Sequence, residues 1–227
     1  MDLVVASYNI HSCYGRDGQH QPDRIKSVLQ GLNADIVALQ EVESLHDAPN
    51  LLEFLCSGQG WQPIQGVTMT RESGPYGNAL LTSLPVELIE RINLSLPGRE
   101  PRGALRVMLS HQGKPLEVTA THLGLWPYER RWQIRRLLER REHASDQHAS
   151  ILMGDLNEWF LWGRPLRWLK QEFSKVPAPP TFPAWRPLFA LDRIWVKPHR
   201  AVAEIKAVNT PLTRSASDHL PLRAVFK

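Results

Sequence analysis

Short runs of apolar and β-branched residues recur along the whole chain, separated by polar residues, glycine or proline. Runs of this length and composition are typical of β-strands. Two longer segments repeat leucine or isoleucine at intervals of three and four residues, with proline in the first turn, and predict helices at Pro22–Leu32 and Pro127–Glu142. The predicted strands cover residues 3–8, 36–40, 79–82, 86–92, 104–109, 116–121, 150–153, 193–196 and 222–226.

The order of these elements argues against a purely alternating parallel sheet. Residues 79–82 are followed closely by residues 86–92, and residues 104–109 by residues 116–121. Each pair predicts an antiparallel hairpin, because a short connection can join only antiparallel neighbours. We therefore predict an α/β (α+β) fold in which two mixed β-sheets pack together and helices flank them.

A single domain over residues 1–227 is the expected organisation. The chain has 227 residues, of which 42% are hydrophobic, so it can bury one large core. Residues 176–187 are rich in proline, which predicts a long ordered loop without regular structure. Strand-like sequence resumes directly afterwards, so we do not interpret this loop as a domain linker.

Composition allows an anionic substrate without requiring one. The net charge is +4 and the sequence pI is about 9.3. Cys13 and Cys56 are too few for a disulfide framework, and we expect both to be reduced. The N-terminus lacks the pattern of a signal peptide and no window is apolar enough to span a bilayer, so we expect a soluble, cytoplasmic monomer.

Polar side chains fall repeatedly at the ends of the predicted strands. An asparagine at such a position is, by itself, more often a turn residue than a ligand. Glu41 directly follows an apolar run, where a carboxylate needs a partner or a cation. Together these side chains would converge on one rim of a sheet, where loops carry function on a rigid scaffold. The strand-end residues are Asn9, Glu41, Asn78, His122, Asp155, Asn157, Asp218 and His219.

Seven short segments around these positions form an ordered series. The segments are Ser7-Tyr8-Asn9-Ile10, Gln40-Glu41-Val42, Gly77-Asn78-Ala79-Leu80-Leu81, Thr121-His122-Leu123, Gly154-Asp155-Leu156-Asn157, Leu191-Asp192-Arg193-Ile194 and Ser217-Asp218-His219-Leu220-Pro221. In this order they resemble the motifs of the endonuclease/exonuclease/phosphatase family, which includes pancreatic-type deoxyribonuclease, abasic-site endonucleases and neutral sphingomyelinases. The resemblance implies a four-layer sandwich of two mixed β-sheets covered by helices, and a magnesium- or manganese-dependent phosphodiester hydrolase.

The resemblance also implies a metal site. Glu41 would be the principal ligand of Mg²⁺ or Mn²⁺, with help from Asn9 and Asp218. Hard oxygen ligands suit these cations, and Mg²⁺ usually takes only one or two protein carboxylates.

Further residues take catalytic roles by the same resemblance. Asp155 would orient or deprotonate the attacking water, and Asn157 would donate an amide hydrogen bond to the phosphate. Asp192 would hold His219, fix its tautomer and raise its pKa. His122 would be either a phosphate ligand or the acid for the leaving group.

Two more residues are expected to support substrate binding. Asn78 would hold the surroundings of the site in place. Arg102 precedes Gly103-Ala104-Leu105 and resembles a position at which some family members bring a guanidinium to the scissile phosphate. A surface arginine in a loop is the equally weighted alternative for Arg102.

The substrate is less tightly specified. Arginines along residues 130–141 could form a nucleic-acid stripe, but glutamates are interleaved with them, which favours a solvated helix face. Tryptophans near the motif loops could stack on bases, insert into lipid or pack beneath a loop. We expect a nuclease-like enzyme acting on DNA, with a phospholipid or another small phosphoester as the alternative. The loop tryptophans are Trp126, Trp159, Trp162 and Trp185.

A non-catalytic binding module is the remaining alternative. Such a protein should have lost at least one residue needed for chemistry. Glu41, Asp155, Asp192 and His219 are all present, which favours an enzyme.

Overall fold

The computed structural model describes residues 2–142, 148–174, 176–197 and 202–227, with the side chains of residues 141 and 142 left out. Over these residues the strands form a six-stranded sheet, in the order β10-β11-β1-β2-β4-β3, and a five-stranded sheet, in the order β5-β6-β7-β8-β9. The strands are β1 (Leu3–Asn9), β2 (Ile36–Glu43), β3 (Gln62–Arg71), β4 (Gly74–Thr82), β5 (Val86–Asn93), β6 (Gly103–His111), β7 (Lys114–His122), β8 (Ala149–Asp155), β9 (Asp192–Lys197), β10 (Val202–Ala207) and β11 (Leu222–Phe226).

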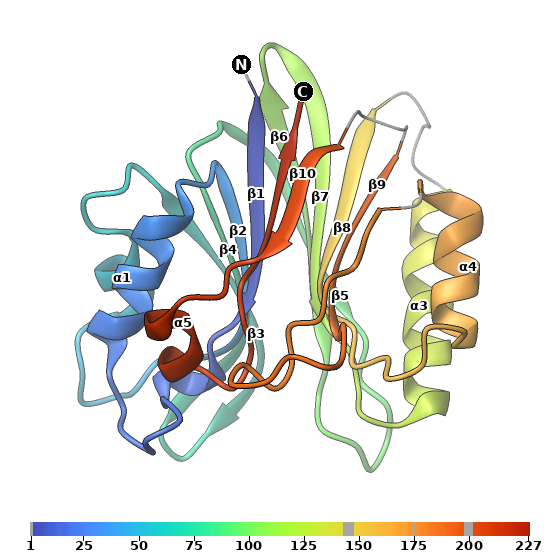
Figure 1. The fold of residues 1–227 in the computed structure, drawn as a ribbon. Coiled ribbons are helices and arrows are strands. Elements are labelled where there is room, and N and C mark those ends of the chain that lie inside the picture. Colours follow the sequence, from blue (N-terminus) through green and yellow to red (C-terminus); the bar gives the residue numbers. More distant parts are fainter. Residues whose placement is uncertain (1, 143–147, 175, 198–201) are drawn as a thin grey trace.

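Helices cover the outer faces of both sheets, which lie side by side in Figure 1. Helices α1, α2 and α5 lie on the side of the six-stranded sheet, and α3 and α4 on the side of the five-stranded sheet. The helices are η1 (His11–Cys13, a single 3-10 turn), α1 (Pro22–Leu32), α2 (Leu51–Cys56), α3 (Pro127–Glu142), α4 (Arg164–Glu172) and α5 (Pro211–Ala216). The predicted four-layer sandwich is confirmed.

Three buried apolar clusters hold these layers together. The central cluster lies between the two sheets, where Val5 and Leu80 of one sheet face Val107 and Val118 of the other. A second cluster joins α1 and α2 to the six-stranded sheet, and a third joins α3 and α4 to the five-stranded sheet. Strands covered on both faces carry apolar residues on both faces, which explains the nearly continuous apolar runs of β1, β2 and β8.

Both sheets are mixed. The β1–β2 and β7–β8 pairs are parallel, whereas the other strand pairs described are antiparallel. The predicted hairpin of residues 104–109 with 116–121 is confirmed as β6–β7. The predicted hairpin of residues 79–82 with 86–92 is wrong, because β4 pairs with β2 and β3 while β5 pairs with β6 in the other sheet. Both edges of β4 are occupied, so the chain crosses to the second sheet at Pro85.

The proline-rich segment is a loop, as predicted. From Val176 to Leu191 the chain has no helix or regular strand, and Phe182 and Phe189 form an isolated bridge within it. Its backbone also bonds to the C-terminal part of the chain, where Ala184 N donates to Asp218 O and Leu220 N donates to Thr181 O. Thr181 N and Phe182 N both donate to Phe189 O, at 2.9 and 3.0 Å, which orders the loop across its width. None of the helices in the described residues is both long enough and apolar enough to cross a membrane.

Candidate active site

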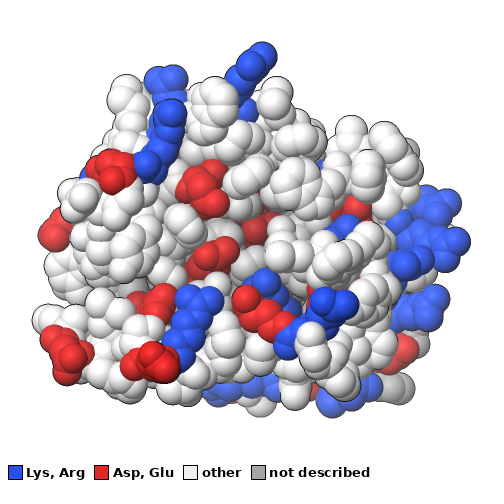
Figure 2. All heavy atoms as spheres, turned by 90° about the horizontal axis from the view of Figure 1, so that it is seen from below, with Lys and Arg blue, Asp and Glu red and all other residues white. Residues whose placement is uncertain are grey.

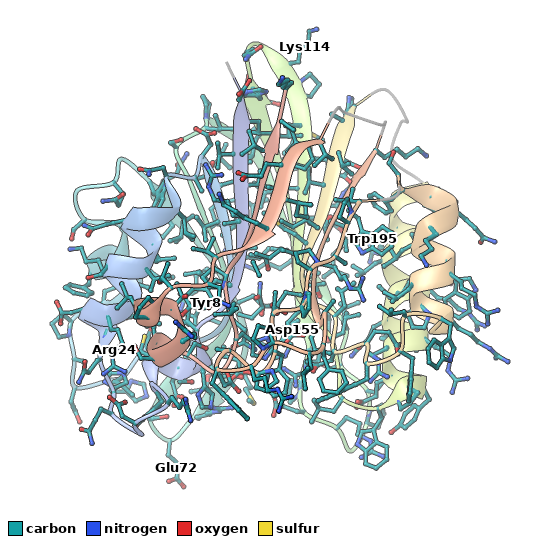
Figure 3. All side chains as sticks on the ribbon, in the orientation of Figure 1. Tyr8, Arg24, Glu72, Lys114, Asp155 and Trp195 are labelled. Atoms are coloured by element: carbon teal, nitrogen blue, oxygen red, sulfur yellow. The ribbon has the colours of Figure 1, made fainter. Side chains whose placement is uncertain are left out.

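The strand-end residues gather at one end of the sandwich. Asn9 ends β1, Glu41 lies near the end of β2, and His122 and Asp155 end β7 and β8. Because β1 and β2 are parallel, their carboxyl ends lie at the same edge of the six-stranded sheet. The parallel pair β7 and β8 likewise ends at one edge of the five-stranded sheet. Figure 3 places Asp155 at the end opposite Lys114, and Figure 2 looks onto this end of the molecule, with acidic side chains near its middle.

Asn9 joins the two sheets at this rim. Its Nδ2 donates to Glu41 Oε1 at 2.9 Å and lies 3.2 Å from Asp155 Oδ2 on the other sheet. Its Oδ1 accepts from the backbone N–H of His11, and its backbone carbonyl accepts from Ser217 Oγ at 2.7 Å. Asn9 is therefore fixed inside a network, in contrast to a solvent-facing turn residue.

Glu41 reaches the rim through an irregular backbone. Its φ is 56°, in the left-handed region that disfavours residues with a Cβ, and the β2–β4 register shifts between Leu39 and Val42. Such bulges re-aim a side chain next to active sites, and the strain persists only where the surrounding structure imposes it.

A chain of charged groups runs from Asp192 through His219 to Asp155. His219 Nδ1 lies 2.8 Å from Asp192 Oδ2, which also accepts from Thr181 Oγ1 at 2.5 Å. His219 Nε2 lies 3.6 Å from Asp155 Oδ2. Burial opposes the charged ring, but the Asp192 and Asp155 carboxylates outweigh it and raise the pKa of His219 to about 10. His219 is thus an imidazolium at neutral pH.

Asp155 has a pKa suited to a base. Burial raises the pKa of Asp155 to about 6, while the charge of His219 and the hydrogen bonds from Asn157 N and Asn9 limit the rise. Asp155 is therefore mostly ionised at pH 7 and can still accept a proton.

Gly154 precedes Asp155 at a close approach of β8 to β7. Its φ is 148°, and it leaves no room for a Cβ, because that atom would lie 1.8 Å from Thr121 O of β7.

His122 and Arg102 form a second buried pair beside this chain. Arg102 Nη1 lies 3.0 Å from His122 Nδ1, and His122 Nε2 faces Asn157 Nδ2 at 3.1 Å and Asp155 Oδ2 at 3.6 Å. Burial and the Arg102 charge hold the pKa of His122 well below its usual range. The surface alternative for Arg102 is wrong, because the side chain is buried against His122, with its Nη1 also 3.1 Å from Glu100.

Asn157 lies at the rim of the site, whereas Asn78 lies beneath the rim. Asn157 N donates to Asp155 Oδ1 at 2.9 Å and its Nδ2 donates to Leu123 O at 2.9 Å, so the turn after β8 holds the amide beside His122. Asn78 Nδ2 donates to Gly103 O at 3.0 Å, which also accepts from Thr121 Oγ1. Asn78 therefore ties β4 to β6 beneath the rim.

The donor set fits a hard divalent cation. Carboxylates of Glu41, Asp155, Asp192 and Asp218 lie around one imidazolium and a neutral His122, which leaves excess negative charge and oxygen donors. Asp155, Asp192 and His219 also have ligand atoms within 4.8 Å of one another. In that group the His219 ring is protonated and has no lone pair for a cation, so the half-buried Glu41 with Asn9 and Asp218 is the better candidate.

Two contributors carried little signal in the sequence. Thr181 fixes Asp192 from within the proline-rich loop, where no motif marks it. Ser217 adjoins Asp218-His219, and its hydroxyl accepts from His219 N at 3.3 Å. Only the folded chain reveals that these hydroxyls hold Asp192 and His219 in place.

The arginines of α3 form a mostly solvated face, as predicted. Arg131 donates to Pro127 O, Arg136 lies 3.9 Å from Glu139, and Arg140 lies 3.2 Å from Glu90. Arg135 stacks over the Trp168 ring. The side chain of Arg141 lies outside the described residues, and Arg130 is an exception because it is buried.

Comparisons with known proteins identify the family and agree with the fold. The Escherichia coli (strain K12) protein YbhP is 33% identical to the chain over 88% of this chain and 86% of its own length. A solved endonuclease/exonuclease/phosphatase from Beutenbergia cavernae superposes with a TM-score of 0.84 at 23% identity, covering 100% of this chain and 71% of that one. D. rerio TDP2, complexed with a single-strand DNA product, superposes with a TM-score of 0.74 at 17% identity, covering 100% and 99%. Residues 6–219 match the Endonuclease/Exonuclease/phosphatase family, and the chain belongs to that family.

Proposed function

We propose that the protein hydrolyses phosphodiesters with the help of a bound divalent cation. The observation that carries this proposal is the chain of contacts from Asn9 through Asp155 and His219 to Asp192. It places a carboxylate with a pKa of about 6 beside an imidazolium, at a rim rich in oxygen ligands.

Each requirement of the reaction has a candidate. Asp155 accepts a proton from the attacking water, and Asn9 and Asn157 keep its carboxylate oriented. The imidazolium of His219 and the amide of Asn157 stabilise charge that develops on the phosphate oxygens. A cation held by Glu41, Asn9 and Asp218 would neutralise phosphate charge and favour departure of the leaving oxygen.

His122 acts as a hydrogen-bond donor in this scheme. A guanidinium can only donate, so His122 Nδ1 accepts from Arg102 and the neutral ring carries its proton on Nε2. Nε2 lies 3.6 Å from Asp155 Oδ2, the acceptor on that side, whereas Asn157 Nδ2 at 3.1 Å is itself a donor. The lowered pKa of His122 favours a phosphate ligand over an acid for the leaving group.

Activity should require a divalent cation. Wild-type protein is expected to hydrolyse bis-p-nitrophenyl phosphate with Mg²⁺ or Mn²⁺ and to lose this activity in a chelator. Activity that survives complete chelation and dialysis contradicts the proposal.

Removal of Glu41 should weaken cation binding. Glu41→Ala takes away the carboxylate that the irregular β2 backbone directs to the rim, so calorimetry should show an at least about tenfold weaker Mn²⁺ affinity. Glu72→Ala is the control, because Glu72 is an exposed acid at the tip of the β3–β4 hairpin (Figure 3). Equal affinities in the two folded variants would remove Glu41 from the ligand set.

The pH profile should have two limbs. Asp155 must be ionised, so activity should rise with pH through about 6, and His219 must be protonated, so activity should fall as pH approaches about 10. Asp192→Asn removes a carboxylate that raises the pKa of His219, so the alkaline limb should move to lower pH. The kcat/KM for bis-p-nitrophenyl phosphate measures both limbs, and an unmoved alkaline limb would show that His219 does not set it.

DNA is the substrate expected from the sequence, and it stays a prediction. The basic pI supports it, and supercoiled plasmid incubated with Mg²⁺ should then be nicked by the wild-type protein. Exposed leucines beside the site favour the second candidate, the phosphodiester of a phospholipid. Headgroup release from vesicles without plasmid nicking would decide for the second candidate.

The cytoplasmic location expected from the sequence also stays a prediction.

A further inference from the structure

Three loops around the active site expose an unusual amount of apolar side chain. Trp162 is 72% exposed, and Leu125, Leu161 and Leu188 are each 60% or 61% exposed. Leu125 follows β7, Leu161 and Trp162 follow β8, and Leu188 lies in the proline-rich loop. We call the set the apolar crown. Its members are Leu125, Trp126, Trp159, Phe160, Leu161, Trp162, Trp185, Leu188 and Phe189.

The apolar crown is continuous with the catalytic groups. The Phe182 ring lies 4.8 Å from the His219 ring and 5.8 Å from the Trp159 ring, which in turn lies 4.9 Å from Phe189. Across the site, Arg102 and Trp126 line one hollow of about 180 Å³. A partner seated on the crown would therefore lie at the mouth of the active site.

Buried polar contacts hold two crown loops together from beneath. The Arg130 side chain is buried, with its Nε 3.2 Å from Glu158 Oε2. Its Nη1 also donates to the carbonyl of Leu125, and Glu158 Oε1 accepts from Phe160 N at 3.3 Å. A buried ion pair with further hydrogen bonds fixes the geometry of these loops. The exposed apolar residues are therefore held in a defined arrangement.

Within the crown loops the charge at the surface has one sign, and the exposed Glu100 lines the hollow beside Trp126. Glu129 and Glu158 are buried within these loops, whereas Arg164 and Arg186 are exposed and Arg131 is half-buried. In residues 125–132, 158–164 and 182–189 every charged side chain that reaches solvent is an arginine. The crown thus combines apolar groups with positive charge.

Further arginines lie at the edges of the apolar crown. Arg99 lies over the Trp126 ring at 5.1 Å, and Arg16 over the Trp185 ring at 5.5 Å. Arg16 and Arg214 line an open hollow of about 530 Å³ beside Trp185, with Asp17, which is paired to Arg24 at 2.7 Å. Lys and Arg side chains also gather on the α3 flank of this face in Figure 2.

We propose that the apolar crown docks the protein on an anionic phospholipid bilayer. Tryptophans and arginines suit the headgroup level, where an apolar body meets a polar, negatively charged layer. Leucine has no π-face on which a nucleic-acid base could stack, so the three exposed leucines favour hydrocarbon over bases as the partner. Contiguous apolar patches of this kind mark interaction sites.

Docking would supply a substrate to the site. This step rests on the proposed function: the crown adjoins His219, so a docked bilayer presents the phosphodiesters of its headgroups to the rim. Shallow insertion of apolar side chains with electrostatic attraction is how interfacial proteins bind reversibly.

Vesicle binding in a chelator tests docking without turnover. Wild-type protein should co-sediment with phosphatidylglycerol/phosphatidylcholine vesicles in EDTA, more weakly with phosphatidylcholine alone and more weakly at high salt. Leu161→Asp and Leu188→Asp, each folded by circular dichroism, should lower the partition coefficient at least about tenfold. Leu88→Asp is the matched control, because Leu88 is 61% exposed but pairs with Met108 toward the other end of the five-stranded sheet.

The outcomes separate docking from catalysis. Absent vesicle binding, or equal losses in all three leucine variants, overturns docking, and hydrolysis of the soluble diester still reports on the proposed function. Binding that persists in a protein unable to cleave any diester supports docking and removes the proposed function. Tight binding of a single-stranded oligonucleotide that displaces vesicles and is lost in Leu161→Asp would assign the crown to nucleic acid and overturn the proposal.

Discussion

Replacing Asp155 by alanine is expected to lower kcat for bis-p-nitrophenyl phosphate by about 10³-fold, the middle of the range for loss of a positioned general base. Asp155 is the carboxylate that Asn9, His122 and His219 all approach, within 3.2 to 3.6 Å of its Oδ2. Its removal takes away the proton acceptor and leaves the His219 charge without its partner at the rim. KM should change far less than kcat, because the base acts in the transition state.

Two further variants make this result specific. Asp155→Asn keeps the shape of the side chain but removes its charge, so its kcat should stay close to that of Asp155→Ala. Asp23→Ala removes an exposed acid from the first turn of α1 and should leave turnover unchanged. Near-wild-type turnover in a folded Asp155→Asn protein would mean that another group activates the water.

The repeated polar residues at strand ends predicted most of the rim, and the family resemblance added Asp192. Asn9, Glu41, His122 and Asp155 each follow an apolar run, and a polar group in that position is informative because burial without a partner is costly. Their convergence depends on the parallel pairing of β1 with β2 and of β7 with β8. Nine of the eleven strands in the described residues were predictable from short apolar runs between turn residues, whereas β3 and β10 were not predicted.

Long-range features were harder to predict. The failed hairpin of residues 79–82 with 86–92 shows why: pairing depends on which edges are already occupied, and β3 occupies the edge of β4. Arg102 looked equally suited to a surface loop, because its burial comes from His122, which lies 20 residues later. The sequence did not single out Arg130 among the arginines of α3. Its pairing with Glu158, which lies 28 residues later, is visible only in the fold.

Asp192→Asn and His219→Ala should each lower kcat by about a hundredfold, within the range for one positioned proton-transfer or charge-stabilising group. Asp192 has no exposed surface, so its effect must pass through the groups that it touches. Its Oδ2 accepts from His219 Nδ1 and from Thr181 Oγ1, and the first contact keeps the imidazole protonated and aimed at Asp155.

The double variant should therefore be little worse than either single variant. Without the imidazole, the Asp192 carboxylate has no ring to orient, so removing its charge costs no further turnover; groups that act as a unit are non-additive in this way. Thr181→Val provides a graded control, because it removes the second hydrogen bond to Asp192 Oδ2 and should lower kcat only several-fold. Each variant is checked for folding by circular dichroism before kinetics. If the double variant loses the full product of the two single losses, about 10⁴-fold, the two residues act independently and the proposed unit is wrong.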